Sequence, residues 1–366
     1  MHPAAESEFD HLPITYVDTA SYGLPPRATV RALSAALEGW VRGVADWQQD
    51  WDAVAEQCRP LAATLLGTSG DEVAFLPAVS VGAAVAFSRL GAADEVLLPD
   101  DEFASVLLPA LAAAEGRGAR IRLVPFRRLA DEVTPDTTFV ATSHVRSADG
   151  AVQDLHRVAE AAEAVGAVVV VDATHSAGVL PVESGDLGLD VVLCAAYKHL
   201  LCPRGVAFMT VSRRMRDRMP PIAASWRSTT ARSRYYGPDL ADLATSAARY
   251  DVSIAWHAWV GAVASLAFLC SVPAKERSSW PVELADSLAE ALGMARSGSS
   301  LLAVPVSSGE RARESLARAG VKVSGRGDAV RVSFHLYNDA ADVTRAAECL
   351  EPLVVNELHP QRERKS

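Results

Sequence analysis

The stretch VVVVDATHS, residues Val168–Ser176, decides the fold class because four consecutive valines lead directly into an aspartate. An uninterrupted run of β-branched residues indicates a strand that is buried on both faces, as strands of parallel sheets are. Asp172 ends this run, so its carboxylate is expected at the carboxyl end of the strand. Two interpretations stay open: Asp172 caps the following loop, or it is a buried carboxylate held opposite a cation.

The sequence around this strand alternates apolar strand-like runs with alanine-rich helical runs from about Leu61 to Met209. This alternation predicts an α/β fold with a mostly parallel sheet flanked by helices. After Ser212 the pattern changes to a basic, turn-rich segment, then a long apolar helical stretch, then short strands mixed with helices. We therefore predict an N-terminal arm (1–15), a large α/β domain (16–255) and a small C-terminal α+β domain with a linking helix (256–366).

The composition of the chain narrows the classes of partner. A formal charge of −10 over 366 residues argues against a nucleic-acid partner, whose binding surfaces are basic. No apolar run approaches the roughly 20 residues of a membrane helix, and the opening MHPAAESEFDHLP lacks the features of a secretory signal. The five cysteines are scattered and form no CxxC pair, which predicts a reduced, cytoplasmic protein without a metal site.

A second stretch, LCAAYKHLLCPRGVAFM (Leu193–Met209), carries one lysine in an apolar run just before a turn signal. A buried lysine loses its hydration, so Lys198 should be paired, chemically engaged or at the surface. The carboxyl ends of neighbouring parallel strands meet at one edge of a sheet, so Asp172 and Lys198 can converge there. Such a pair suits pyridoxal phosphate, because the lysine forms a Schiff base with it and the aspartate keeps its pyridine nitrogen protonated.

The motifs VDATHS and AAYKHLLCPRG resemble the class V branch of the pyridoxal-phosphate enzymes with the aspartate aminotransferase fold (fold type I). This branch includes cysteine desulfurases, kynureninase and isopenicillin N epimerase-like proteins. The resemblance covers nearly the whole chain, since YVDTASYGLPP, DEVAFLPAVSVGAA, TSHVRSADGAVQDL and VRVSFHLYND follow in the family's order. It implies an enzyme with pyridoxal phosphate as cofactor, a small-molecule amino acid as substrate, and a homodimer with shared active sites.

The resemblance implies roles for the residues of the two central motifs and of the first helix start. Lys198 is expected to be the Schiff-base lysine, and Asp172 the partner of the pyridine nitrogen. Ser80, together with the backbone N–H groups of Val79 and Val81, suits the cofactor phosphate. A plain helix cap is the alternative for Ser80.

Five further residues are expected around the cofactor by the same resemblance. Phe103 falls where an aromatic side chain stacks on the pyridine ring, with a core phenylalanine as the alternative. Ser147 and His175 match positions near the ring hydroxyl, although a buried structural histidine would also fit His175. Tyr197 is placed to reach the phosphate through its hydroxyl, and Ser253 matches the segment that reaches the phosphate in the partner subunit.

The C-terminal motif bears on the reaction. Arg331 alternates with apolar neighbours on a strand, and by the resemblance it clamps the substrate α-carboxylate rather than facing solvent. Cysteine desulfurases carry a nucleophilic cysteine shortly before this arginine, whereas RAGVKVSGRGDAVR (Arg318–Arg331) contains none. Without that thiol we expect β-elimination. Within the family the chain is most similar to the hercynylcysteine sulfoxide lyases of ergothioneine biosynthesis, which implies a C–S lyase that yields pyruvate and ammonia.

Other functions remain open for the same motifs. They are a kynureninase-like hydrolase, an epimerase, an aminotransferase, a desulfurase-like enzyme, and a binding protein that has lost the cofactor.

Hercynine carries a trimethylammonium group, which aromatic faces can hold. The candidates for such a cation pocket are Trp226, Tyr235, Tyr236, Trp256 and Trp259, with packing in the core or at a dimer interface as the alternative.

Overall fold

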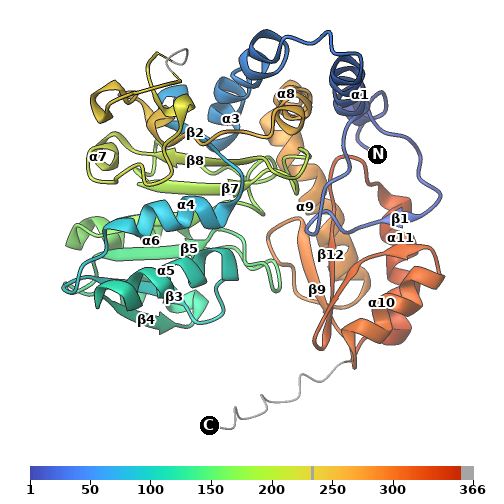
Figure 1. Cartoon of the computed structure of the whole chain (residues 1–366). Helices are drawn as coiled ribbons and strands as arrows, with labels where there is room; N and C mark the ends of the chain where they lie inside the picture. The colour runs from blue at the N-terminus through green and yellow to red at the C-terminus, as the bar shows by residue number, and fades with distance from the viewer. Residues whose placement is uncertain (232–234, 356–366) are drawn as a thin grey trace.

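A computed structural model describes residues 1–231 and 235–355 and contains a seven-stranded sheet (Figure 1). Across the sheet the strands are β2 (Val73–Leu76), β8 (Ala207–Val211), β7 (Val191–Ala195), β6 (Val168–Asp172), β5 (Phe139–Ser143), β3 (Glu95–Pro99) and β4 (Arg120–Val124). Neighbouring strands are parallel except at β8, which runs antiparallel to both β2 and β7. The mostly parallel α/β fold predicted from the sequence is confirmed.

The central strand β6 is buried on both faces, which explains its run of valines. Val169 and Val171 belong to the core on one side of the sheet, and Val168 and Val170 to the core on the other. The first side is covered by α3 (Cys58–Leu66), α6 (Leu155–Val165) and α8 (Trp256–Ser271), and the second by α4 (Val79–Ala86) and α5 (Ala104–Arg117) (Figure 1). Alternate residues of a strand point to opposite faces, so both sets must be apolar.

The order of the strands creates a crevice at the carboxyl ends of β3 and β5. The chain passes from β3 to β4 on one side, whereas β5 lies on the other side of β3. Open α/β sheets bind ligands where the strand order reverses in this way. Phe103 follows β3 and Ser147 follows β5, so the sheet topology brings these two predicted residues to the same crevice.

A second sheet is formed by the C-terminal part of the chain. Its three antiparallel strands are β9 (Leu301–Pro305), β12 (Ala329–Ser333) and β11 (Ser324–Arg326), and its core is shared with α9 (Ala274–Ala291), α10 (Gly309–Arg318) and α11 (Ala340–Leu350). The N-terminal segment joins this part, because β1 (Thr15–Tyr16) pairs with β10 (Val321–Lys322) and Asp18 bridges to Ser333. The division into arm, large domain and small domain stays a prediction, and residues 356–366 lie outside the described chain.

The remaining helices complete the large unit. They are α1 (Arg27–Val41), which packs against α8, and the short α2 (Ala53–Ala55) and α7 (Arg213–Arg216). In the described part of the chain, no single helix has the length and apolar composition to cross a membrane. Only α8 and α9 taken together meet those criteria, and they are bent by 91° relative to each other.

Candidate active site

A cavity of about 220 Å³ lies at the carboxyl ends of the parallel strands. Most of the residues predicted to bind the cofactor line it: Val79, Ser80, Phe103, Ser147, Asp172, His175, Tyr197 and Lys198. Arg331 reaches the same region from β12, because its guanidinium bonds to Ser147. Val81 and Ser253 do not line this cavity. Residues from distant parts of the sequence therefore converge on one site.

The amine of Lys198 is buried in this cavity and carries an unusually low pKa. Its Nζ lies 3.2 Å from Nε2 of His175 and 5.2 Å from the centre of the Phe103 ring. Burial lowers the pKa of Lys198 to about 8, while the carboxylate of Asp172 acts in the opposite direction. Low polarity disfavours the ammonium form. At neutral pH the side chain therefore releases its proton far more readily than an exposed lysine.

The turn that presents Lys198 is fixed from two sides. Leu201 adopts a positive φ of 56°, which is costly for a residue with a branched side chain and marks a constrained turn. From the N-terminal segment, the N–H of Gly23 donates to the carbonyl of Tyr197 at 2.9 Å. A Cβ at position 23 would lie 2.2 Å from the Lys198 carbonyl oxygen, so only glycine allows this close approach.

Asp172 is held at the end of β6 by its neighbour Thr174. The N–H of Thr174 donates to Oδ1 of Asp172 at 2.9 Å, and the Thr174 hydroxyl accepts from the N–H of Ala195 on β7 at 2.9 Å. Burial raises the pKa of Asp172, and the hydrogen bonds from Thr174 and the charge of Lys198 oppose this rise. The carboxylate thus depends on a cationic partner in the cavity to remain ionised.

His175 lies within the cavity as a neutral imidazole. Burial and the nearby charge of Lys198 hold its pKa well below the ordinary value for histidine. Its Nδ1 atom is buried and has no hydrogen-bond partner among the described residues. A buried polar atom without a partner is costly, so a ligand that supplies one would be favoured here.

The first turn of α4 borders the cavity, and its hydrogen bonds correct the prediction that the N–H of Val81 is free. The N–H groups of Val79 and Ser80 have no partner among the described residues, as expected for the start of a helix. The N–H of Val81, however, donates to the carbonyl of Ala78 at 3.2 Å. Val81 was therefore wrongly predicted to offer a free N–H, because the tight first turn of the helix already uses it. The N–H of Ser80 takes its place.

Arg331 lies almost fully buried on β12, with only 1% of its surface exposed. One terminal nitrogen donates to the carbonyl and hydroxyl oxygens of Ser147 at 3.0 and 2.9 Å, and the other donates to the hydroxyl of Ser21 at 3.3 Å. Burial lowers its pKa to about 10, and the charge of Arg326 contributes to the shift. No carboxylate forms an ion pair with Arg331 in the described chain, so the guanidinium can take an acidic ligand.

The residues of the site that were not predicted from the sequence include Thr174 and Arg204, which line the cavity, and Glu102 and Arg326, which lie beside it. Glu102 follows β3 and bonds through its carboxylate to the N–H and hydroxyl of Ser143, and burial raises its pKa to about 7. Its position after a buried strand was the available signal. Thr174 and Arg204 line the cavity beside predicted residues, but short polar residues in loops are too common to stand out in a sequence.

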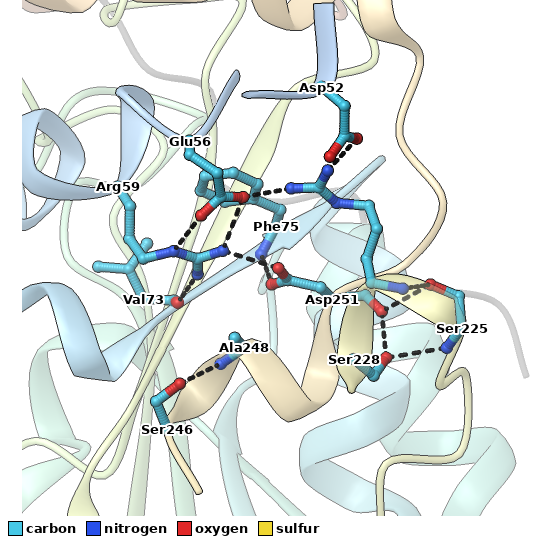
Figure 2. A network of polar contacts seen from close by, with 11 residues as sticks. Asp52, Glu56, Arg59, Val73, Phe75, Ser225, Ser228, Ser246, Ala248 and Asp251 are labelled. Atoms are coloured by element: carbon cyan, nitrogen blue, oxygen red, sulfur yellow. Dashed lines mark hydrogen bonds and ion pairs between the residues drawn. The ribbon is translucent and has the colours of Figure 1, made fainter. Parts of the chain in front are cut away.

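Ser253 is exposed and lies at the end of a segment that is anchored by a buried charge network (Figure 2). Two residues earlier, the carboxylate of Asp251 accepts from the N–H of Phe75 at 2.8 Å and from Arg59 at 2.7 Å. Arg59 also bonds to Glu56, which in turn bonds to the fully buried Arg227. The backbone before Ser253 is therefore anchored to β2 through Phe75 and to α3 through Arg59.

The aromatic residues considered for a cation pocket do not line the cavity around Lys198. Trp259 is fully buried, with its ring centre 4.2 Å from that of Phe75, so it takes the alternative role of packing in the core. It faces the sheet because α8 packs directly on β2 and β8. Trp226, Tyr235 and Trp256 instead gather around Trp47, which stacks on Trp256 at 4.8 Å.

Comparison with known proteins identifies the fold and the family of this chain. Solved structures with the same fold are pyridoxal-phosphate enzymes of fold type I. The cysteine desulfurase CsdA of Escherichia coli gives a TM-score of 0.79 at 22% identity, covering 93% of this chain and 96% of the other. The cystine C-S lyase C-DES gives 0.85 at 21% identity, covering 94% and 98%. Residues 15–297 match the Aminotransferase class-V family, and the chain belongs to it.

Curated relatives span several activities of this family. A probable cysteine desulfurase of Aeropyrum pernix is 31% identical over 251 residues, which cover 63% of this chain and 60% of the relative. A kynureninase of Deinococcus radiodurans is 32% identical over 235 residues, which cover 60% and 57%. The match thus spans about 60% of each relative's length. A variant of C-DES carries glycine linked to its pyridoxal phosphate, which confirms the predicted cofactor at the level of the family.

The network around Asp251 predicts a stability effect. Replacing Asp251→Ala leaves the Phe75 N–H and part of the Arg59 charge buried without their partner, so we expect a loss of about 3–5 kcal/mol in the free energy of unfolding. Chemical denaturation measures it. Asp217→Ala is the matched control, since that carboxylate is 92% exposed and pairs loosely with Arg249, and it should change stability by less than about 0.5 kcal/mol. Equal losses of stability in the two variants would contradict the stabilising role of the network around Asp251.

The pKa of Lys198 predicts its reactivity in the cofactor-free protein. We expect its acylation by acetic anhydride, followed by mass spectrometry, to reach half-maximum near pH 8 because burial lowers its pKa to about 8. Asp172→Asn removes the charge that favours the ammonium form, so the midpoint should fall further. Asp186→Asn, at an exposed position, should leave it in place. A midpoint near the ordinary pKa of 10.5 would overturn the assignment.

Proposed function

We propose that this chain is a pyridoxal-phosphate-dependent C–S β-lyase that cleaves an S-substituted cysteine sulfoxide, with hercynylcysteine sulfoxide as the substrate. The observation that carries the proposal is that a weakly basic Lys198 amine and the Asp172 carboxylate share one cavity, that Arg331 reaches it through Ser147 without an ion pair in the described chain, and that no reactive thiol lies nearby. This set can bind an amino acid and move its α-proton, but it offers no sulfur nucleophile.

The residues of the cavity fit pyridoxal phosphate. Asp172 would face the pyridine nitrogen, and Phe103 would cover one face of the ring. The buried Nδ1 of His175, which lacks a partner among the described residues, offers a contact for the ring hydroxyl. The free N–H groups of Val79 and Ser80 at the start of α4, with the hydroxyl of Tyr197, suit the phosphate. When bound, the cofactor supplies an electron sink for the pair left at the substrate Cα.

Two side chains of this protein have separate roles in the elimination: one binds the substrate and the other moves its proton. Arg331 holds the substrate α-carboxylate through two parallel hydrogen bonds and so fixes the Cα–H bond. Lys198, which would first hold the cofactor covalently, takes the α-proton as a general base, because its pKa of about 8 lies near the working pH. The Cβ–S bond breaks, and its electron pair leaves with the sulfur as a sulfenate. Water converts the remaining 2-aminoacrylate to pyruvate and ammonia, so the elimination itself needs no oxidant or reductant.

The cysteines argue against persulfide formation. Cys194 and Cys202 are buried, and burial raises the pKa of each thiol, so neither becomes a thiolate readily. Cys270 lies on α8 and Cys349 on α11, away from the Lys198 cavity. The hairpin formed by β11 and β12 carries no cysteine and leaves no room for a mobile loop between Arg326 and Ala329. The sulfur therefore leaves with its substituent.

A different class V reaction is the second candidate. It is favoured by the kynureninase relative and by a 30% identical isopenicillin N epimerase of Streptomyces clavuligerus. The cavity residues that bind the α-carboxylate and move the α-proton would serve a hydrolase, an epimerase or an aminotransferase equally well. Only elimination produces pyruvate from an S-substituted cysteine, so the product separates the two candidates.

We further propose a cytoplasmic homodimer in which Ser253 reaches the cofactor phosphate bound in the partner subunit. Ser253 is exposed and absent from its own chain's cavity, yet the buried network behind it fixes its position. A rigid, exposed polar residue is suited to complete a neighbouring site. Residues 1–15, 16–255 and 256–366 would form the arm, the large domain and the small domain of each subunit.

The test of the lyase function combines a visible spectrum with a pyruvate assay. The purified protein with pyridoxal phosphate should show the absorbance of bound cofactor and should form pyruvate from hercynylcysteine sulfoxide faster than from cysteine or S-methylcysteine sulfoxide. Lys198→Ala should lower the rate at least about a thousandfold, as expected for loss of a general base. Lys275→Ala, at an exposed lysine, should not. A coloured protein that forms no pyruvate from any of these substrates would refute the lyase and favour another class V reaction.

A further inference from the structure

The hairpin of β11 and β12 places a second arginine beside the predicted carboxylate clamp. Ser324 is paired directly with Arg331, and Arg326 with Ala329. Residues opposite each other in an antiparallel pair share a face, and so do residues two apart along a strand. Arg326 and Arg331 therefore project from the same face as diagonal neighbours, a relationship in which residues lie about 7–8 Å apart and their Cβ atoms somewhat closer.

The backbone that carries Arg326 is rigid. Gly309 at the start of α10 packs against the hairpin so closely that a Cβ there would lie 2.3 Å from the Ala329 carbonyl oxygen. A Cβ on Gly325 would lie 2.1 Å from the Gly309 carbonyl oxygen. The N–H of Gly309 also donates to the carbonyl of Gly327 in the hairpin turn at 2.8 Å. The backbone therefore fixes the position of the Arg326 Cα relative to β12, while the exposed side chain stays free to reach a ligand.

The charge of Arg326 acts on the site and meets no counter-charge among the described residues. Its side chain is exposed and makes no hydrogen bond or ion pair with the residues that the structure describes. Its positive charge contributes to the lowered pKa of Lys198 and of Arg331, although burial is the larger cause for both. Like charges brought together in this way repel one another, so an additional anion at this point would be favoured.

A count of the charges facing the cavity shows what remains for a ligand. The cations in or beside the cavity are Lys198, Arg204, Arg326 and Arg331, and the acidic groups near them are Asp172, Asp18 and Glu102. The charge of Asp172 balances that of Lys198, and the charge of Asp18 partly balances that of Arg331. A cofactor phosphate near Arg204 and a substrate α-carboxylate on Arg331 would still leave Arg326 without an anion.

We propose that Arg326 is a specificity-determining residue that binds an acidic group on the sulfur substituent of the substrate. This inference rests on the proposed lyase function and adds to it the substrate class: S-substituted cysteines with a second carboxylate on the leaving side. The α-carboxylate binds Arg331, which is buried, and the second carboxylate binds the exposed guanidinium of Arg326, its diagonal neighbour on the hairpin. The carboxylate of a hercynyl substituent belongs to this class.

The test compares an acid with its uncharged isostere in both binding and turnover. The binding probes for the holoenzyme are 3,3′-thiodipropionate, which lacks the reacting amine, and its monoamide, with dissociation constants from calorimetry. The turnover probes are S-(2-carboxyethyl)-L-cysteine sulfoxide and S-(2-carbamoylethyl)-L-cysteine sulfoxide, assayed by pyruvate. We expect the unmodified protein to prefer the acid about ten- to a hundredfold in each pair, as for a charge-assisted contact.

Variants of Arg326 and Arg318 test whether the preference for the acid depends on Arg326. Arg326→Gln should reduce the preference for the acid to within about threefold, because the amide cannot replace the charge. Arg318→Gln, at an exposed position at the end of α10, should keep it. An undiminished preference in Arg326→Gln, or no preference in the unmodified protein, overturns the proposal. Acid-selective binding lost in Arg326→Gln but without pyruvate refutes only the lyase reaction, whereas pyruvate without acid selectivity refutes only the role of Arg326.

Discussion

The burial of one lysine amine beside one carboxylate is the constraint on which the rest of this site depends. Lys198 would be an ordinary cation in water, but the cavity removes its hydration and lowers its pKa to about 8. Asp172 limits this shift, and Thr174 in turn holds Asp172 against β7. Each partner is costly to bury alone, so the pair is stable only where the sheet edge positions both.

The site is assembled from segments that are far apart in the chain, and close backbone contacts join them. Gly23 brings the N-terminal segment onto the lysine turn. Ser147, which follows β5, bonds to Arg331 from the C-terminal sheet. The N-terminal segment also adds β1 to β10 of the C-terminal part. Movement of the C-terminal sheet relative to the large sheet would therefore change the distance between Arg331 and Lys198, the residues proposed to bind the substrate carboxylate and to move its α-proton.

Charge is distributed unevenly between the chain and its site. The whole chain carries a formal charge of −10, whereas the cavity and its mouth carry an excess of arginine and lysine over acidic groups. A cationic cleft on an acidic protein attracts small anions that can enter it. The acidic surface around the cleft repels large acidic molecules. Such a field suits a phosphate-bearing cofactor and the acidic substrate proposed above, and the charges of Arg331 and Arg326 add to the lowering of the Lys198 pKa by burial.

The sequence by itself determined the α/β fold, the family motifs and the residues that follow the strands, because buried parallel strands need unbroken apolar runs and their ends must carry the chemistry. It correctly brought Asp172, His175 and Lys198 to one edge of the sheet. It did not reveal that the N–H of Val81 donates to Ala78, that Trp259 lies in the core, or that Arg326 is a diagonal neighbour of Arg331 on the hairpin. Only the tertiary structure decided these points, since hydrogen-bond partners, burial and cross-strand neighbours depend on contacts between distant segments that no local pattern encodes.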